Sequence, residues 1–147
     1  MLYTIGDAAS HMGIAASALR YYDKEGLLPF VDRSSSGIRM FKESDMEWLK
    51  LIECLKATGM PIKEIKKFID LYTAGDATLK PRRDMFYERK QAVEEQIVAL
   101  QKTLDFIKYK CWYYDTAVAA GSADIPQSIK PEDMPKDILA MKLNAGL

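Results

Sequence analysis

The sequence predicts a mostly helical protein, an all-α fold that carries one small β-hairpin. Three observations indicate this class. Short helical segments near the N-terminus are bounded by capping residues and by Gly or Pro. Two short strand-like pieces flank a turn rich in Ser and Gly. A long stretch after residue 78 repeats its apolar residues at heptad spacing.

Two short helices are predicted at the start of the chain. Thr4-Ile5-Gly6-Asp7 resembles a capping box with Asp in the place of Glu, and this first helix ends at Gly13. The second helix runs from about Ala16 to Glu25 and is stopped by the Gly and Pro that follow. Helix, tight turn and helix at this spacing predict a helix-turn-helix.

A hairpin and two more helices follow. Phe30 to Arg33 and Ile38 to Phe41 are strand-like pieces around a Ser-Ser-Ser-Gly turn, so they predict a wing. Ser44-Asp45-Met46-Glu47 reads as a capping box for a helix that stops at Gly59. Pro61 then begins another helix. The apolar face predicted for it consists of Ile62, Ile65, Ile69 and Tyr72.

The longest periodic stretch follows a break at Ala74 to Thr78, and Pro81 falls in its first turn, where proline is tolerated. Phe86 begins the apolar pattern. The heptad positions are then Val93, Ile97, Leu100, Leu104, Ile107 and Cys111. About 35 helical residues would span roughly 50 Å, too long for a small head domain to cover the stripe alone. We therefore expect dimerisation through this helix; packing back onto its own head domain is the alternative.

These patterns divide the chain into a winged helix-turn-helix domain (1–74), a linker and dimerisation helix (75–114) and a tail (115–147). The tail is punctuated by Gly121, Pro126, Pro131 and Pro135, with a weak helix at Asp137 to Leu143. It is short for a separate ligand-binding domain, but it could fold over the long helix.

Charge gives the wing and helices little general attraction for nucleic acid. The net charge is zero, and the first 76 residues hold 10 Lys and Arg against 11 Asp and Glu. DNA binding must then depend on local placement of cations. The sequence shows neither a long apolar run nor a signal peptide, so we expect a cytoplasmic protein that does not enter the membrane.

Three motifs in order carry a family resemblance. They are Ala18-Leu19-Arg20-Tyr21-Tyr22-Asp23-Lys24-Glu25-Gly26-Leu27-Leu28-Pro29, then Gly37-Ile38-Arg39-Met40-Phe41, then Gly59-Met60-Pro61-Ile62-Lys63-Glu64-Ile65. Over residues 3 to 114 the chain resembles the MerR family of bacterial transcription regulators. The resemblance implies a homodimer joined by an antiparallel coiled coil. Such a dimer binds a pseudo-palindromic operator, then bends and untwists promoter DNA for RNA polymerase.

The predicted DNA contacts lie on the second helix and the wing. Arg can bind guanine or phosphate in bidentate fashion, and a Tyr hydroxyl reaches phosphate. The candidates are Ser17, Arg20, Tyr21, Tyr22 and Lys24 on the helix, with Arg33 and Arg39 in the wing. Leu19 and Tyr22 lie further round the helix, where they can pack on the first helix, and Arg33 is either a phosphate contact or simply solvated. The chain departs from the family pattern at positions 15, 17 and 18, which predicts a weaker start to this helix.

Cys54 is a candidate sensor. Trp48, Leu51, Ile52 and Leu55 form the expected apolar stripe of its helix, and Cys54 falls off the centre of that stripe. Lys50 would favour its thiolate, while Glu47 would oppose it. In the resembled family a short branch with a cysteine here is associated with reactive carbonyl or nitrosative stress. The alternative is an inert, half-buried thiol.

Other chemistry is less supported. Cys111 is expected in the helix seam, and two distant cysteines provide neither a metal site nor an iron–sulfur site, so we expect no cofactor. Trp112, Tyr113 and Tyr114 indicate either core packing or a pocket for an apolar effector. We expect no enzyme activity, although a Cys54–His11 pair is conceivable. The alternative function is a protein-interaction or architectural dimer without promoter-specific regulation.

Overall fold

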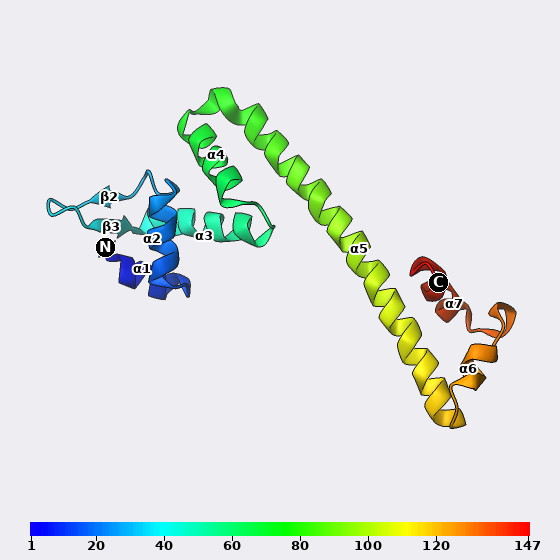
Figure 1. Ribbon diagram of the computed structural model, residues 1–147. Coiled ribbons are helices and arrows are strands. Elements are labelled where there is room, and N and C mark those ends of the chain that lie inside the picture. The colour runs from blue at the N-terminus through cyan, green and yellow to red at the C-terminus, as the bar shows by residue number, and fades with distance from the viewer. The chain divides into compact units, whose positions relative to one another are not determined.

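The computed structural model describes all residues from 1 to 147 and is mainly helical (Figure 1). In chain order the elements are β1 (Leu2–Tyr3), α1 (Ile5–Met12), α2 (Ala16–Lys24), β2 (Asp32–Arg33), β3 (Arg39–Lys42), α3 (Glu43–Ala57), α4 (Ile62–Thr73), η1 (Asp76–Thr78), α5 (Leu79–Ala120), α6 (Asp124–Ser128), η2 (Pro131–Asp133) and α7 (Lys136–Asn144). None of these helices combines the length and the apolar character needed to cross a bilayer.

The chain forms two compact units, Met1–Lys90 and Gln91–Leu147. The boundary therefore falls inside α5, whereas the sequence led us to place boundaries at 74 and 114. The reason is that the first turns of α5 pack into the head: Met85 is buried in the head core, and Phe86 meets Phe68 edge-on with ring centres 5.4 Å apart. We call Met1–Lys90 the head.

The predicted start of α1 is confirmed. The Asp7 amide donates to the Thr4 hydroxyl at 3.2 Å, and the Thr4 amide donates to the Asp7 carboxylate at 3.1 Å. Gly13 ends the helix with φ of 67°, a conformation that favours glycine. The start of α2 has Ala15 as its N-cap with no side-chain hydrogen bond, in agreement with the weaker start that the sequence predicts.

The wing is part of a three-stranded antiparallel sheet in the order β1-β3-β2. β2 and β3 form the predicted hairpin, with Arg33 directly opposite Arg39. The turn is closed by the Gly37 amide, which donates to the Ser34 carbonyl at 2.9 Å. β1 was not predicted, because two residues before a helix cap are too short for a period-two pattern.

Two expectations for α3 are wrong. The helix begins at Glu43, directly after β3, so Ser44 is inside it; the Asp45 carboxylate accepts the Lys42 amide at 2.8 Å. The buried face consists of Met46, Leu49, Ile52 and Leu55, whereas Trp48 and Leu51 lie at its edge. Trp48 instead joins a surface aromatic cluster, described below. The core face is thus rotated from the stripe we predicted.

The head core is closed by residues from α1, α2, α3, α4 and the start of α5. Its most buried side chains are Leu19, Tyr22, Leu27, Leu28, Phe41, Met46, Leu49, Ile52, Ile65 and Ile69. On α4 the buried face is Ile65, Phe68 and Ile69, while Tyr72, predicted to be on it, is half-exposed at its edge. This core fixes α2 and the wing, the elements that carry the predicted DNA contacts.

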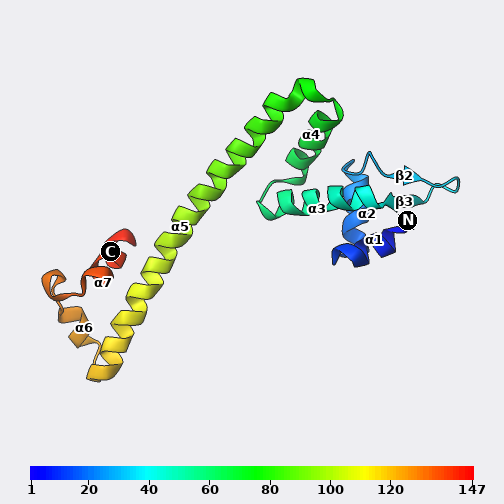
Figure 2. The same cartoon turned by 180° about the vertical axis from the view of Figure 1, so that it is seen from behind.

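The long helix α5 contains 42 residues, roughly 63 Å at 1.5 Å per residue. It runs to Ala120, beyond the predicted end at 114, because Ala117, Ala119 and Ala120 are strong helix formers and only Gly121 stops it. The tail then folds back along the second half of α5, as both ribbon views show (Figures 1 and 2). The weak helix predicted in the tail is α7.

Candidate nucleic-acid interface

The outer face of α2 is open. Ser17, Arg20, Tyr21 and Lys24 are all exposed, as their helical spacing predicts. Arg20 and Lys24 form no hydrogen bond or ion pair within the protein. Two cations, a hydroxyl and a phenol on one face of a short helix provide donors for phosphate and for guanine. The structure thus leaves these four side chains available to a ligand.

Tyr22 does not share this face. Its side chain is 1% exposed, and its hydroxyl donates to the Glu53 carboxylate at 2.5 Å. Lys56 of α3 donates to the same hydroxyl at 3.2 Å. Burial, followed by the hydrogen bond and charge of Glu53, raises the pKa of the Tyr22 hydroxyl. Tyr22 therefore ties α2 to α3, and this placement does not fit the DNA contact that we predicted for it.

Asp23 joins α2 to the wing. Arg39 donates to one of its carboxylate oxygens and Arg33 donates to the other at 3.2 Å. Arg39 also donates to the Val31 carbonyl at 2.5 Å, and Arg33 to the Gly37 carbonyl at 2.7 Å. We call these three side chains, Asp23, Arg33 and Arg39, the wing clamp.

The wing clamp has an electrostatic reason. Arg33 and Arg39 are direct cross-strand neighbours, and like charges in that position destabilise a hairpin. One carboxylate that accepts from both guanidinium groups offsets this repulsion and fixes the wing against the C-terminal end of α2. The Arg39 side chain is only 20% exposed, and its charge is paired with Asp23 within the protein. The sequence led us to predict both arginines as DNA contacts, but in this structure they serve first as a brace.

Lys42 is the wing cation that the sequence analysis missed. It is exposed and pairs with the exposed Asp32, which raises the pKa of Lys42 and lowers the pKa of Asp32. An exposed pair of this kind is weak and is readily exchanged for another partner. The sequence signal for this residue was the pairing of β2 with β3, which places Lys42 at the end of β3.

Cys54 lies on the exposed side of α3, as its position off the apolar face predicts. Cys111 is also exposed in the isolated chain. Neither thiol is part of a cluster, and no group of three or more His, Cys, Asp or Glu side chains is placed to hold a metal ion. His11 meets the ring of Tyr3, with centres 6.1 Å apart, and forms no pair with Cys54.

α5 carries an apolar stripe on one side and a stripe of mixed aromatic and polar residues on the other. The apolar one continues the predicted heptads without interruption to the end of the helix, and we call it the open seam. Its members are the half-buried Val93 and the exposed Ile97, Leu100, Leu104, Ile107, Cys111, Tyr114 and Val118. At about 100° per residue, the stripe of Asp105, Tyr109, Trp112 and Thr116 faces the opposite side of the helix.

The tail covers that second stripe. Asn144 of α7 donates to Asp105 at 2.5 Å, and the Lys142 ammonium lies 5.6 Å from the centre of the Tyr109 ring. Tyr109 and Met134 are buried as a result. The tail therefore leaves the open seam uncovered, because it occupies the other side of the helix.

This arrangement divides the aromatic cluster for which the sequence left either core packing or an effector pocket open. Trp112 stacks beside Tyr109 on the tail side, with ring centres 6.2 Å apart, and the Tyr113 hydroxyl donates to the Ala123 carbonyl at 3.2 Å. Tyr114 is 58% exposed and belongs to the open seam. Core and tail packing, the first of these two interpretations, describes Trp112 and Tyr113.

A helix-turn-helix with a wing, followed by a long helix, defines a class of DNA-associated folds. Comparison with known proteins identifies the family. Residues 3–71 match the MerR HTH family regulatory protein model, and residues 46–108 match the model described as MerR, DNA binding. The chain belongs to the MerR family.

Two relatives extend over most of the chain. A Haemophilus influenzae protein described as an uncharacterised HTH-type transcriptional regulator is 44% identical over 130 residues, which is 86% of this chain and 96% of the relative. The crystal structure of HiNmlR, a MerR family regulator lacking the sensor domain, bound to promoter DNA, matches with a TM-score of 0.73 and 44% identity. The match covers 85% of this chain and 99% of the HiNmlR chain.

A more distant relative points to the same branch. The regulator AdhR of Bacillus subtilis is 35% identical over 91 residues, covering 62% of this chain and 65% of AdhR. The resemblance to the NmlR/AdhR-like branch of the family is thereby supported. Both relatives are described as HTH-type transcriptional regulators.

Proposed function

We propose that this protein is a DNA-binding transcriptional regulator that acts as a homodimer on promoter DNA. The observation that carries the proposal is the open face of α2: unpaired Arg20 and Lys24 beside Ser17 and Tyr21, presented by a MerR-family head. A relative of 44% identity is bound to promoter DNA in its crystal structure, which supports the same partner here.

The homodimer is supported by the open seam. Leu100 is 68% exposed and Ile97 is 60% exposed, and the tail contacts the other side of the helix only from Asp105 onward. An apolar stripe at heptad spacing is the surface that a second helix of the same kind covers. Pairing two long helices places two copies of α2 on one DNA molecule, which suits a two-fold symmetric operator.

The mechanism follows from the two halves of the molecule. Two heads held by one pair of helices grip separate half-sites, and their contact energy offsets the deformation of the spacer, of the order of 1–6 kcal/mol. Bending and untwisting the spacer brings the promoter elements into register for RNA polymerase. The resemblance to the family is the support for this step.

Cys54 is the residue we propose for an electrophile or redox response. It is exposed on α3 within the head, whereas the open seam that contains Cys111 becomes covered in a dimer. An aldehyde or nitrosating agent should therefore modify Cys54 faster than Cys111, measured by mass spectrometry after brief treatment. The Cys54→Ser variant should bind promoter DNA but lose the response in transcription in vitro; equal labelling of both thiols, or a normal response, would contradict this role.

DNA binding is tested with the promoter fragment upstream of the chain's own gene, in a titration over several salt concentrations. Arg20→Ala should weaken binding by about 1–3 kcal/mol. Arg83→Ala is the matched control, since Arg83 is an exposed arginine on α5. Equal binding by both variants would overturn the assignment of α2. Binding of the wild type that shows no preference for the promoter would favour the architectural alternative.

A further inference from the structure

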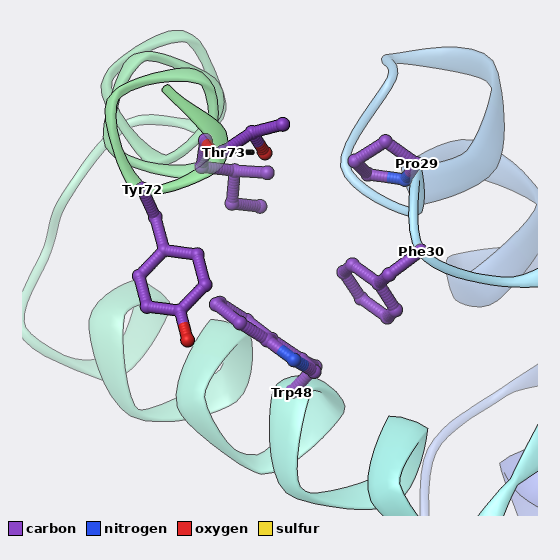
Figure 3. A pocket seen from close by; sticks show the side chains of 6 residues that line it. Pro29, Phe30, Trp48, Tyr72 and Thr73 are labelled. Carbon is purple, nitrogen blue, oxygen red and sulfur yellow. Dashed lines mark hydrogen bonds between the residues drawn. The ribbon is translucent and has the colours of Figure 1, made fainter. Parts of the chain in front are cut away.

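An aromatic cleft on the head is not used by any part of the proposed DNA interface. It has a volume of about 320 Å³ and is lined by Pro29, Phe30, Trp48, Ile69, Tyr72 and Thr73. Figure 3 shows Pro29 and Phe30 on one side, Tyr72 and Thr73 on the other, and Trp48 below the gap between them. The walls come from the loop after α2, from α3 and from α4.

The rings of the cleft are already arranged for stacking. Phe30 and Trp48 are stacked with centres 5.2 Å apart and an angle of 26° between their planes. Trp48 meets Tyr72 edge-on at 4.5 Å. A flat molecule between Phe30 and Tyr72 would extend this aromatic set, and offset or edge-on ring pairs contribute about 0.5–1.5 kcal/mol beyond the burial of area.

The chemistry of the walls selects an uncharged ligand. None of the six lining side chains carries a charge, and the Thr73 hydroxyl already donates to the Ile69 carbonyl at 2.9 Å. The Arg82 guanidinium lies 5.1 Å from the centre of the Tyr72 ring, so that ring already has a cation beside it and would disfavour a second. A volume near 300 Å³ falls at the small end of ligand pockets.

We propose that this cleft binds a small uncharged aromatic compound of one or two fused rings. The ligand bridges the loop that follows α2 and the C-terminal end of α4. Both walls belong to the head, so the site is complete within one chain. Its occupation holds the loop that follows α2 against α4.

Binding is tested on the full chain without DNA, using indole as the probe. The readout is the methyl NMR signal of Ile69, with Ile125 of α6 as an internal reference. We expect indole to shift the Ile69 signal and leave Ile125 unchanged, whereas the cation tryptamine and the anion indole-3-acetate bind at least tenfold more weakly. A response common to all three probes, or no shift of Ile69 at millimolar indole, would overturn the proposal.

Two variants and a control locate the site. Phe30→Ala removes one wall and Thr73→Phe places a ring in the gap, and each should weaken indole binding at least tenfold. Tyr87→Ala, at an exposed position on α5, should bind as the wild type does. Circular dichroism verifies that the variants are folded. If both variants bind indole as the wild type does, the cleft is not the indole site. The same conclusion follows if the Ile69 signal shifts when the protein is diluted but does not shift when indole is added.

Discussion

The head and the second half of α5 treat their apolar side chains in opposite ways. In the head, Leu49 and Ile52 are fully buried among residues of the same unit. Along α5, Leu100 and Leu104 remain 68% and 43% exposed, although the tail packs on the same helix. The difference shows that the head closes its own core, whereas the open seam is left exposed, and we propose that a second copy of the chain covers it.

A second contrast lies within the head. On α2 the cations face solvent without partners, while the wing arginines are held by Asp23. Charge count alone would treat Arg20 and Arg39 alike. The structure separates a cation available to phosphate from one that fixes the geometry of the site.

The largest effect is expected from the open seam. Leu100→Glu with Leu104→Glu places charges where a second helix should pack, and should give monomers that bind promoter DNA at least 100-fold more weakly. Val98→Glu is the matched control, because Val98 is 67% exposed on the opposite side of the same helix. Sedimentation velocity measures the oligomeric state, and DNA titration measures the affinity. An unchanged dimer in the double variant would mean that the open seam is not the dimer interface.

The head core should respond in a different way. Ile52→Ala leaves a cavity in a closed core and should lower the free energy of unfolding by about 2–5 kcal/mol. Its sedimentation mass should equal that of the wild type at concentrations where it is folded. Denaturation in urea measures the change in the free energy of unfolding. Loss of less than 1 kcal/mol would mean that the head core is not closed as described.

The wing clamp should have a smaller effect. Asp23→Ala and Arg39→Ala should each destabilise the protein by about 1–3 kcal/mol, because each removes charged hydrogen bonds at a partly buried site. The double variant should lose clearly less than the sum, which is the signature of a coupled pair. Strictly additive losses in urea denaturation would mean that the two residues act separately.

The smallest effect concerns the cap of α1. Hydrogen bonds from the Thr4 hydroxyl and amide lower the pKa of Asp7 below its ordinary value of 3.8. A lowered pKa stabilises the fold at pH values above 3.8, and this contribution is lost as the pH falls through the lowered value. Asp7→Asn should therefore be less stable than the wild type at pH 6, with the difference shrinking in acid; a difference that is constant with pH would contradict this origin.

Much of the molecule could be predicted from the sequence. Caps and stops are local, so α1, α2, the wing and the start of α5 were predicted close to their observed positions. The open face of α2 also followed from spacing alone. Periodicity identified the seam, although it continues to Val118, beyond the end we predicted.

The remaining features depend on contacts between distant segments. The sequence shows neither that Asp23 accepts from two wing arginines nor that Tyr22 reaches Glu53, since each pair is brought together only by the folded head. The same holds for the tail, whose helix α7 contacts Asp105 across 39 residues. Local pattern predicts which side chains are apolar or charged, and the tertiary fold decides which of them are left for a partner.

The measurement that tests the central claim most directly is the stoichiometry of the wild-type chain on promoter DNA. Sedimentation equilibrium of a labelled duplex at increasing protein concentration reports the mass of the complex. The account predicts that two chains of 16.7 kDa bind each duplex together, with no stable complex of one chain. A complex of one chain and one duplex with the same affinity would contradict it, because the open seam would then have no role in binding DNA.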